Sequence, residues 1–380
     1  MKRANIFGWV LLLAVVVSCR DKFEPDLEST TESHLVVDGV LNTGSGGTHI
    51  QLSRTTTLDS RVQIVPEPNA MVTVEGEDNS VQPLFWNGSG LYASGGLNLT
   101  INSNYRLRIK TTDGREYLSE YVTARRTPPI DSVGYHKKEH GIQLYVNARD
   151  PSNSTWYYRY EFDETWEIHS FYFSKYIYVK PTNSVRDRVP GEEVFQCWKY
   201  GSSTGIALAS SVRLQQDVIH EAPIHFIAKN SERMSVRYSI LVRQYAIDKP
   251  GYEFYEQMKQ NTESMGTVFD PQPSQVWGNV KCITDPKELV IGYVSACEIQ
   301  QKRIFISAQE LDDWRFFQDC PNKNIANHPD SLKEFSYGVY QPYSSVISVT
   351  TGAITHYVSA AKECVDCTER GGSLIRPSYW

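Results

Sequence analysis

Short runs of alternating apolar and polar residues, separated by turn residues, are the main pattern in the first third of the chain. Residues 70–75 and 105–110 alternate in this way, as expected for strands with one buried face. Residues 87–90 read as a turn, and Asp113-Gly114 is typical of a two-residue hairpin turn. Strands at intervals of roughly 8–12 residues indicate an immunoglobulin-like or fibronectin-like β-sandwich over residues 34–126.

A second, larger domain follows. Pro128 and Pro129 mark the boundary, because proline cannot donate to a strand ladder. Residues 142–147 and 234–246 again alternate as strands. The predicted fold class is therefore mainly β, with a β-sandwich followed by a larger β-rich domain over residues 127–380.

Two short helices are expected within this larger domain. Apolar residues at helical spacing predict a helix over residues 251–264. The capping box formed by Ser307 and Glu310 predicts a second helix over residues 308–317. Residues 265–285 show little periodicity and are interpreted as a long ordered loop.

Residues 1–18 have the layout of a lipoprotein signal peptide, and Cys19 follows them directly. Lys2 and Arg3 give a positive start, and an apolar run over residues 6–17 comes next. About 12 apolar residues are too few for a transmembrane helix, which needs about 20 to span roughly 30 Å of hydrocarbon. We therefore predict cleavage before Cys19 and attachment of a diacylglycerol to its thiol.

The mature chain begins with a polar, acidic stretch over residues 19–33, which reads as a tether. The 14 residues that follow Cys19 reach at most about 45–50 Å when fully extended. Loss of Lys2 and Arg3 with the signal peptide changes the formal net charge from −6 to −8. A mildly acidic chain without a long basic run argues against nucleic-acid binding.

The cysteine count favours disulfides. With Cys19 lipidated, six of the seven cysteines remain, an even number in an exported chain. We expect two or three bridges, with the pairing left open. Cys364 and Cys367 form a C-x-x-C motif, but the sequence shows neither the second pair that zinc would need nor a following helix that a redox site would need. Cys320 is an alternative partner for either cysteine. The six disulfide candidates are Cys197, Cys282, Cys297, Cys320, Cys364 and Cys367.

Two motifs that resemble chemical sites are interpreted as structural. Residues 201–205 match G-x-S-x-G, but a strand-like segment follows them, so we expect a Gly/Ser hairpin turn instead of a hydrolase elbow. His136 and His140 could share a metal on a helix, but they fall between two predicted strands and are expected in a solvent-facing turn. The sequence predicts no catalytic residue, no metal and no cofactor.

Aromatic residues are concentrated between positions 156 and 178. The set consists of Trp156, Tyr157, Tyr158, Tyr160, Trp166, Phe171, Tyr172, Phe173, Tyr176 and Tyr178. Alternate members are expected to fill a β-core, whereas exposed members could stack on sugar rings or contact a protein.

Motifs spread along residues 20–380 resemble a known family. The most specific are FDPQPSQ at residues 269–275 and CVDCTERGG at residues 364–372. The others lie at residues 35–39, 68–74, 90–92, 105–107, 197–198, 206–210, 278–280, 292–296, 302–306 and 377–380. Together they resemble the Bacteroidota outer-membrane lipoproteins classed as domain of unknown function 4249. Cys297 stands where this resemblance leads us to expect a small residue such as serine.

The resemblance implies location and partners more than chemistry. Such lipoproteins are often encoded beside TonB-dependent receptors, and the family supplies no catalytic residues. Asp21, Glu24 and Asp26 resemble the signals that export lipoproteins of these bacteria to the cell surface. We expect a lipid-anchored protein at the cell surface, with the periplasmic face of the outer membrane as the alternative.

Three functional hypotheses follow. The leading one is a non-enzymatic lipoprotein that binds a TonB-dependent transporter or its cargo at the outer membrane. The second is a surface glycan-binding protein or hydrolase that uses the aromatic region 156–178. The third is a structural or assembly factor of the envelope.

Overall fold

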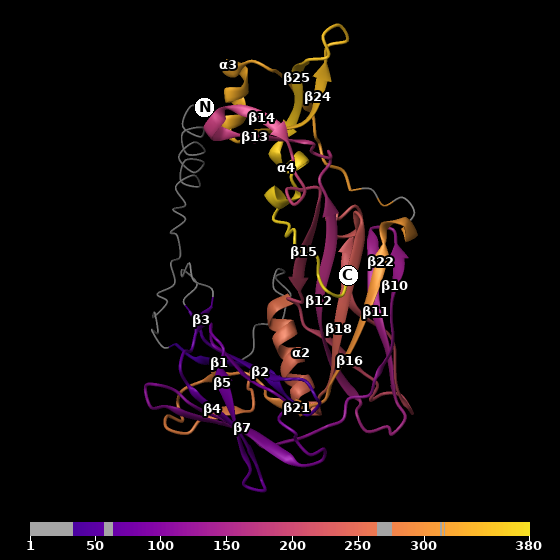
Figure 1. Ribbon diagram of the computed structural model, residues 1–380. Coiled ribbons are helices and arrows are strands. Elements are labelled where there is room, and N and C mark those ends of the chain that lie inside the picture. Colours follow the sequence, from indigo (N-terminus) through magenta and orange to yellow (C-terminus); the bar gives the residue numbers. More distant parts are fainter. Residues whose placement is uncertain (1–32, 57–63, 264–275, 312–313, 315) are drawn as a thin grey trace, which may run out of the picture.

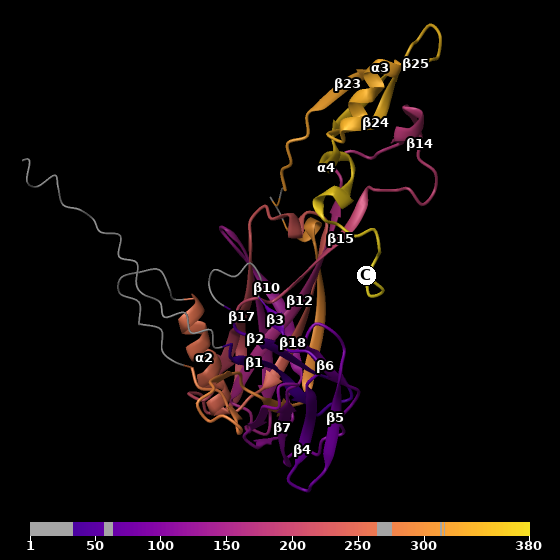
Figure 2. The same ribbon diagram turned by 90° about the vertical axis from the view of Figure 1, so that its left-hand side faces the viewer.

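The computed structural model describes residues 33–56, 64–263, 276–311, 314 and 316–380. The structure has three β-rich parts, named here the N-terminal sandwich, the central sandwich and the distal lobe. Figures 1 and 2 both place the N-terminal sandwich and the distal lobe at opposite ends of the central sandwich. The mainly β fold class with a few short helices is confirmed. Among the described residues, no helix has both the length and the apolar character needed to cross a membrane.

The N-terminal sandwich is a 12-stranded sheet folded over one core, with the strand order β19-β8-β7-β4-β5-β6-β2-β1-β20. The strands β3, β9 and β21 pair at its sides with β2, β7 and β1. The strands are β1 (Leu35–Asn42), β2 (Thr48–Arg54), β3 (Val65–Pro66), β4 (Met71–Gly76), β5 (Val81–Trp86), β6 (Leu91–Ser94), β7 (Asn104–Lys110), β8 (Glu116–Ser119), β9 (Val122–Thr123), β19 (Val280–Cys282), β20 (Val290–Ile291) and β21 (Ser295–Cys297).

Alternation explains how these strands build the core. Val72 and Val74 of β4 and Leu107 and Ile109 of β7 are buried, while the residues between them face outward. Gly114 lies at φ +89° in the turn that joins β7 to β8, a conformation that favours glycine. The predicted hairpin is therefore confirmed, but its loop has three residues, 112–114, and not two, because Thr111 faces Arg115.

Three strands of this sheet come from much later in the chain. The strand β19 pairs with β8, and both β20 and β21 run parallel to β1. Two predictions made from the sequence differ from the structure. The loop expected over residues 265–285 contains β19, while its first part lies outside the described residues. The division expected at 126/127 also separates β19, β20 and β21 from the sheet that they join.

The central sandwich packs two antiparallel sheets against each other over one core. One sheet has the order β10-β11-β17, and the other has the order β15-β12-β18-β22, with β16 also paired to β12. The strands are β10 (Ile130–Lys138), β11 (Gly141–Asp150), β12 (Tyr157–His169), β15 (Gln196–Ser202), β16 (Ala207–Ser210), β17 (Asp217–Ala228), β18 (Arg237–Ala246) and β22 (Ile299–Ser307). The predicted strand over residues 234–246 is thus β18, which begins after a 3-10 turn at Glu232–Met234.

The longest strand, β12, sets the two faces of this sheet. Its even-numbered residues from Tyr158 to Ile168 are all buried between the sheets, and all are apolar or aromatic except Glu164. Its odd-numbered residues face the outside of the sandwich. The outer face therefore carries a row of charged side chains along β12.

Helices are few and short. The helix α2 (Lys249–Glu263) confirms the one expected over residues 251–264, and Figure 1 shows it beside the lower half of the central sandwich. The second expected helix, over residues 308–317, is wrong. The capping box of Ser307 and Glu310 is present, but it closes only a 3-10 turn at Ala308–Glu310. A capping box satisfies the first turn and does not by itself supply the packed apolar face that extends a helix.

The distal lobe combines a hairpin from the middle of the chain with a three-stranded sheet, ordered β23-β25-β24, from its end. The elements are β13 (Tyr176–Val179), a 3-10 turn (Lys180–Thr182), β14 (Ser184–Asp187), β23 (Asn322–Ala326), α3 (Pro329–Leu332), a 3-10 turn (Lys333–Tyr337), β24 (Tyr340–Ile347), β25 (Ile354–Ala361), α4 (Lys362–Val365) and a 3-10 turn (Cys367–Arg370). Its apolar residues form two small clusters, so the stability of the lobe depends more on the covalent links at its base.

The last residues of the chain fold back onto the outer face of the central sandwich, where Figure 1 shows the C-terminus in front of β18. The hydroxyls of Tyr379 and Thr165 lie 2.7 Å apart, and the guanidinium of Arg303 lies 3.7 Å from the centre of the Tyr379 ring. The indole of Trp380 donates to Glu167 over 3.1 Å. The tail therefore covers the half of the outer face that is nearer to the distal lobe.

Candidate functional site

The uncovered half of that outer face forms one wall of a cleft against the N-terminal sandwich. The opposite wall consists of β1 and β2 of the N-terminal sandwich, and the cavity between them is about 450 Å³. Its polar lining side chains are Asp38, Asn42, His49, Gln51, Arg159, Glu161, Arg243, Tyr245 and Gln301. We call this cavity the interdomain cleft. Its volume lies in the range of small-molecule pockets, about 300–1,000 Å³.

Strand alternation brings the charged residues of the cleft to one face. Arg159 and Glu161 are successive outward positions of β12, and Arg243 and Tyr245 are successive outward positions of β18. The antiparallel register pairs Glu161 with Arg243 and Arg159 with Tyr245. Each cation therefore lies next to an acid or an aromatic ring.

Arg159 is the most buried charge of the cleft. It is 6% exposed, and its Nη2 lies 2.8 Å from Glu161 Oε1. Its guanidinium is 4.9 Å from the centre of the Tyr245 ring and 4.5 Å from that of Tyr255, which belongs to α2. Burial alone would lower the pKa of Arg159, but the fields of Tyr255, Glu161 and Asp38 raise it above its ordinary value.

The remaining charges form a chain that leads out of the cleft. Tyr245 donates to Glu161 Oε2 over 2.6 Å, and Arg243 lies 3.8 Å from the same oxygen. Arg243 also binds Asp163 with two nitrogens, one of them at 3.0 Å. This hydrogen bond to Asp163 is the main cause of the raised pKa of Arg243. Arg159 and Arg243 are therefore held in fixed positions before any partner binds.

Three polar side chains of the cleft are exposed to solvent and have no side-chain partner among the described residues. Asp38 and His49 come from β1 and β2, and Gln301 comes from β22. No side-chain hydrogen bond or ion pair joins any of them to another residue in the described part of the chain. In addition, Arg159 Nε finds no acceptor there. The cleft thus offers a carboxylate, an imidazole and an amide to an incoming molecule.

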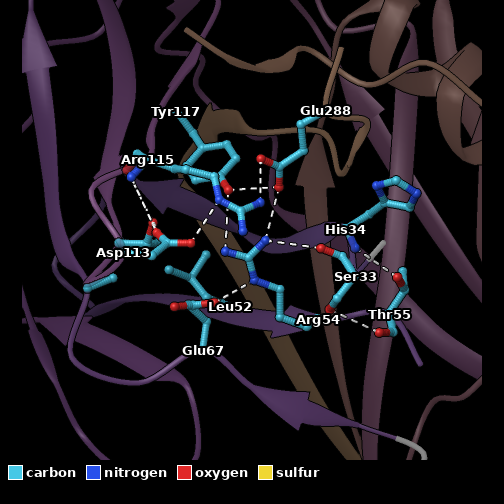
Figure 3. A network of polar contacts seen from close by, with 12 residues as sticks. Ser33, His34, Leu52, Arg54, Thr55, Glu67, Asp113, Arg115, Tyr117 and Glu288 are labelled. Atoms are coloured by element: carbon cyan, nitrogen blue, oxygen red, sulfur yellow. Dashed lines mark hydrogen bonds and ion pairs between the residues drawn. The ribbon is translucent and has the colours of Figure 1, made fainter. Parts of the chain in front are cut away.

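A second polar cluster, shown in Figure 3, has its charges paired and serves the fold. Glu288, from the loop between β19 and β20, lies 3.0 Å from Arg54 Nη1 and 2.8 Å from Arg115 Nη1. Tyr117 donates to Glu288 over 2.8 Å. Burial would raise the pKa of Glu288, but the hydrogen bonds from Arg115 and Tyr117 and the nearby positive charges lower it. The cluster fastens the late segment to the N-terminal sandwich.

The structure pairs four of the six predicted disulfide cysteines. Cys197 bonds to Cys367 and Cys320 bonds to Cys364, so the two cysteines of the C-x-x-C motif have different partners. The other two candidates, Cys282 and Cys297, are free and buried, which corrects the expectation for them. They sit on β19 and β21, which flank opposite ends of the strand order in the N-terminal sandwich. Cys19 lies outside the described residues.

The G-x-S-x-G segment is neither a hydrolase elbow nor the predicted hairpin turn. Both β15 and β16 pair antiparallel with β12, so they run in the same direction along one edge of the sheet. Residues 203–206 interrupt this edge strand. Ser203 continues the hydrogen bonding to β12, because its amide donates to Phe162 O over 2.8 Å and its hydroxyl accepts from Phe162 N over 3.2 Å. A serine engaged in this way lacks the strand–turn–helix setting of a nucleophile.

The two predicted turn histidines are separated by the structure. His136 is inside β10, where it stacks on Tyr145 at 4.6 Å and lies 2.9 Å from Glu221, which corrects its predicted place in a turn. His140 is in the turn between β10 and β11 and is exposed. Within the described ranges, no cluster of three or more His, Cys, Asp or Glu side chains is arranged to hold a metal.

The aromatic region 156–178 divides between two roles. Tyr158, Tyr160 and Trp166 are buried in the core of the central sandwich, as expected for alternate strand positions. Phe171 and Phe173 are exposed near the base of the distal lobe. The remaining tyrosines of the region pack in or beside the lobe or near α2. The region is therefore not one continuous aromatic platform.

Sequence reasoning missed the cleft itself. A signal was present, since Arg237 and Arg243 fall on the polar side of their strand, opposite the apolar set. Arg159 and Glu161 show the same alternation within the aromatic region. What the sequence could not show is that β1 and β2 face this polar side.

Comparison with known proteins identifies a family and little more. The family model described as "Domain of unknown function (DUF4249)" matches residues 20–303. No curated protein matches the chain. A solved structure described as "Cytokine receptor complex - Crystal form 1A" is 10% identical, with a TM-score of 0.20, and the match covers 72% of this chain and 96% of that chain. A score this low supports no argument.

Proposed function

Because the chain belongs to the DUF4249 family, whose domain has no known function, we propose that it is a lipid-anchored binding protein of the outer membrane in a member of the Bacteroidota. Cys19 carries the lipid, and the two sandwiches and the lobe form the body that binds. The support for the anchor is the signal layout of residues 1–18 and the acidic stretch that follows it. The body faces the cell surface.

The interdomain cleft is the binding site in this proposal. The observation that carries it is the convergence of Asp38, His49 and Gln301 on one cavity, from both sandwiches, without side-chain partners among the described residues. The three side chains are exposed, so water solvates them in the free protein and a polar ligand could replace that water. The paired Arg159 and Arg243 beside them fix the shape of the site.

The partner is a TonB-dependent transporter or the cargo that it takes up. A role in binding agrees with the setting of Ser203, which holds a strand edge together and is not presented as a nucleophile. If the protein instead binds a glycan or assembles the envelope, substitutions in the cleft should leave capture of the transporter unchanged.

Pull-down of the native protein from solubilised outer membranes tests the proposal. We expect a β-barrel transporter or a bound ligand to be recovered with the wild type and to be lost with the double substitution Asp38→Asn, His49→Gln. A matched control, Asp78→Asn, alters an exposed carboxylate far from the cleft and should leave recovery unchanged. Recovery of the protein alone would contradict the proposal.

A further inference from the structure

The hairpin of β24 and β25 is the outermost part of the distal lobe. Figures 1 and 2 both show the loop between these strands at the end of the molecule furthest from the N-terminal sandwich. The segment that follows β23 stops short of this loop, because Asn327 donates to Thr355 O over 2.8 Å and to Ile354 O over 3.1 Å. Residues 346–354 therefore project from the lobe, and we call them the hairpin tip.

The hairpin tip exposes aliphatic side chains. Val349 is fully exposed, and Val346 and Ile347 are 42% and 57% exposed. Ile347 pairs across the hairpin with Ile354, which is partly exposed. Three exposed aliphatic residues within four positions give the lobe an apolar end. An apolar patch of this kind marks a surface that meets an apolar partner.

No charged side chain accompanies these residues in the sequence. Residues 335–361 contain no Lys, Arg, Asp or Glu, although these four types make up 22% of the chain. His356 is the only basic residue of this stretch. Charged side chains strongly oppose transfer from water to hydrocarbon, so their absence removes the main barrier to burial of the hairpin tip in an apolar medium.

The backbone of the hairpin tip satisfies its own amides. Ser348 N donates to Ala353 O, and Gly352 N donates to Ser348 O, both over 2.9 Å. The amides of Thr350 and Thr351 donate to the hydroxyl of Ser348 over 3.3 Å. Ala353 N donates to the hydroxyl of Thr351 over 3.4 Å. Five amides of the loop thus lose no partner when water leaves, which lowers the cost of moving the loop out of water.

These properties favour a lipid bilayer over a protein as the partner of the hairpin tip. The core of a bilayer offers no hydrogen-bond donor or acceptor, so a segment that enters it must satisfy its own backbone. The energetic centres of protein interfaces are enriched in Trp, Tyr and Arg. Residues 346–354 contain none of these three types.

We propose that the hairpin tip inserts Val346, Ile347 and Val349 into the membrane leaflet that holds the lipid of Cys19. The inference rests on the anchor of the proposed function, because the anchor keeps the protein next to a bilayer. The tether ends at Ser33, which bonds to Thr55 in the N-terminal sandwich. The anchor and the hairpin tip therefore act at opposite ends of the molecule, and together they lay its long axis along the membrane.

A fluorescent label beside Val349 tests the insertion in the full lipid-anchored protein. Thr350→Cys supplies an exposed thiol for a nitrobenzoxadiazole dye, and the labelled protein is reconstituted in phosphatidylcholine vesicles. We expect a blue-shifted emission that is quenched by lipids with a nitroxide on the acyl chain. Both effects should persist in about 1 M NaCl, where the Debye length is about 3 Å, because the contact is apolar. Wild type taken through the same labelling gives the background from other thiols.

Matched variants separate insertion from general contact with the vesicle. Thr112→Cys labels an exposed threonine in the turn between β7 and β8, and its dye should stay in water. Ile347→Asp combined with Val349→Asp changes only exposed side chains and should return the Thr350→Cys label to water. Val339→Asp, at a residue 54% exposed directly before β24, should leave that label inserted.

Flotation of the vesicles measures the anchor separately. Protein that stays behind when the vesicles float overturns both the anchor and the insertion. Protein that floats with its Thr350→Cys label in water overturns the insertion alone. A label that is shielded only when outer-membrane proteins are added to the vesicles assigns the hairpin tip to a protein partner and also overturns the proposal.

Discussion

Arg54 and Glu288 are 234 residues apart in the chain, yet their side chains form an ion pair with 3.0 Å between Nη1 and Oε1. Both are nearly buried, and Figure 3 shows them at the centre of a network that joins β2 and β8 to the late segment. The pair is what one expects if the N-terminal sandwich is completed only when residues 280–297 return to it.

Glu288→Gln should therefore destabilise the protein. The substitution removes the negative charge but leaves Arg54 buried, and loss of one partner from a mostly buried ion pair costs about 2–4 kcal/mol. Urea unfolding at neutral pH measures the effect on the free energy of unfolding. The control Glu120→Gln removes an exposed carboxylate that pairs with Lys281, and it should change stability by less than about 0.5 kcal/mol. Equal effects of the two substitutions would show that the network does not hold the late segment.

The same carboxylate should make stability depend on pH. The pKa values of Glu75, Glu164 and Glu288 are lowered in the folded protein from a reference of 4.5. A lowered folded pKa means that the stability these groups contribute is complete above about pH 4.5 and is lost as the pH falls through the folded values. Urea unfolding at pH 7 and pH 3 should show a large loss for the wild type. The difference between wild type and Glu288→Gln should shrink as the pH falls below 4.5 and the carboxylate of Glu288 takes up a proton, and a constant difference would contradict this.

How much of this fold the sequence predicts depends on how local the signal is. Alternation in residues 70–75 and 105–110 identified β4 and β7, because burial of one face is written into neighbouring residues. The return of β19 next to β8 could not be predicted, since a three-residue strand has too few residues for a pattern and its partner is far away in the chain. The capping box at Ser307 led to a wrong prediction for the opposite reason. The local signal is correct, but it closes only a 3-10 turn and no helix follows it.

The candidate sites show the same limit. The polar side of β12 and β18 can be read from alternation, but the fact that it faces Asp38 across a cleft is a tertiary relation. The buried carboxylate of Glu164 is harder still to predict, because it occupies an inward position of β12 where the pattern predicts an apolar residue. Such departures from pattern are the most informative positions to inspect first when a structure becomes known.

Arg159 should not tolerate replacement by lysine. Its planar guanidinium lies against Tyr245 and Tyr255 while it pairs with Glu161, and a lysine ammonium cannot do both. We expect Arg159→Lys to lower the free energy of unfolding by about 1–2 kcal/mol. The same substitution at the exposed Arg149 of β11 should have almost no effect. Thermal unfolding of both variants checks this, and similar melting temperatures would mean that the stacking adds nothing.

The distal lobe should depend on its disulfide. Cys320–Cys364 closes a loop of 44 residues, and the chain-entropy account assigns such a link up to about 4 kcal/mol. The two apolar clusters of the lobe are small, so the double substitution Cys320→Ala, Cys364→Ala should loosen the lobe and leave the central sandwich folded. Limited proteolysis should then cut within residues 329–337 of the variant and spare that segment in the wild type. Cuts spread over β12 and β18 would instead show that the lobe and the central sandwich unfold together.

The cysteines allow the lipid anchor to be tested by counting thiols. Four of the seven cysteines are in disulfides, and Cys282 and Cys297 are free but buried. Burial also raises the pKa of Cys297 to about 12, which suppresses its reactive thiolate. A thiol reagent should therefore label no cysteine of the native protein, and it should label two after denaturation without reductant if the Cys19 sulfur is blocked by lipid. Three labelled thiols would mean that Cys19 is unmodified, and that result would remove the basis for placing this protein at the membrane.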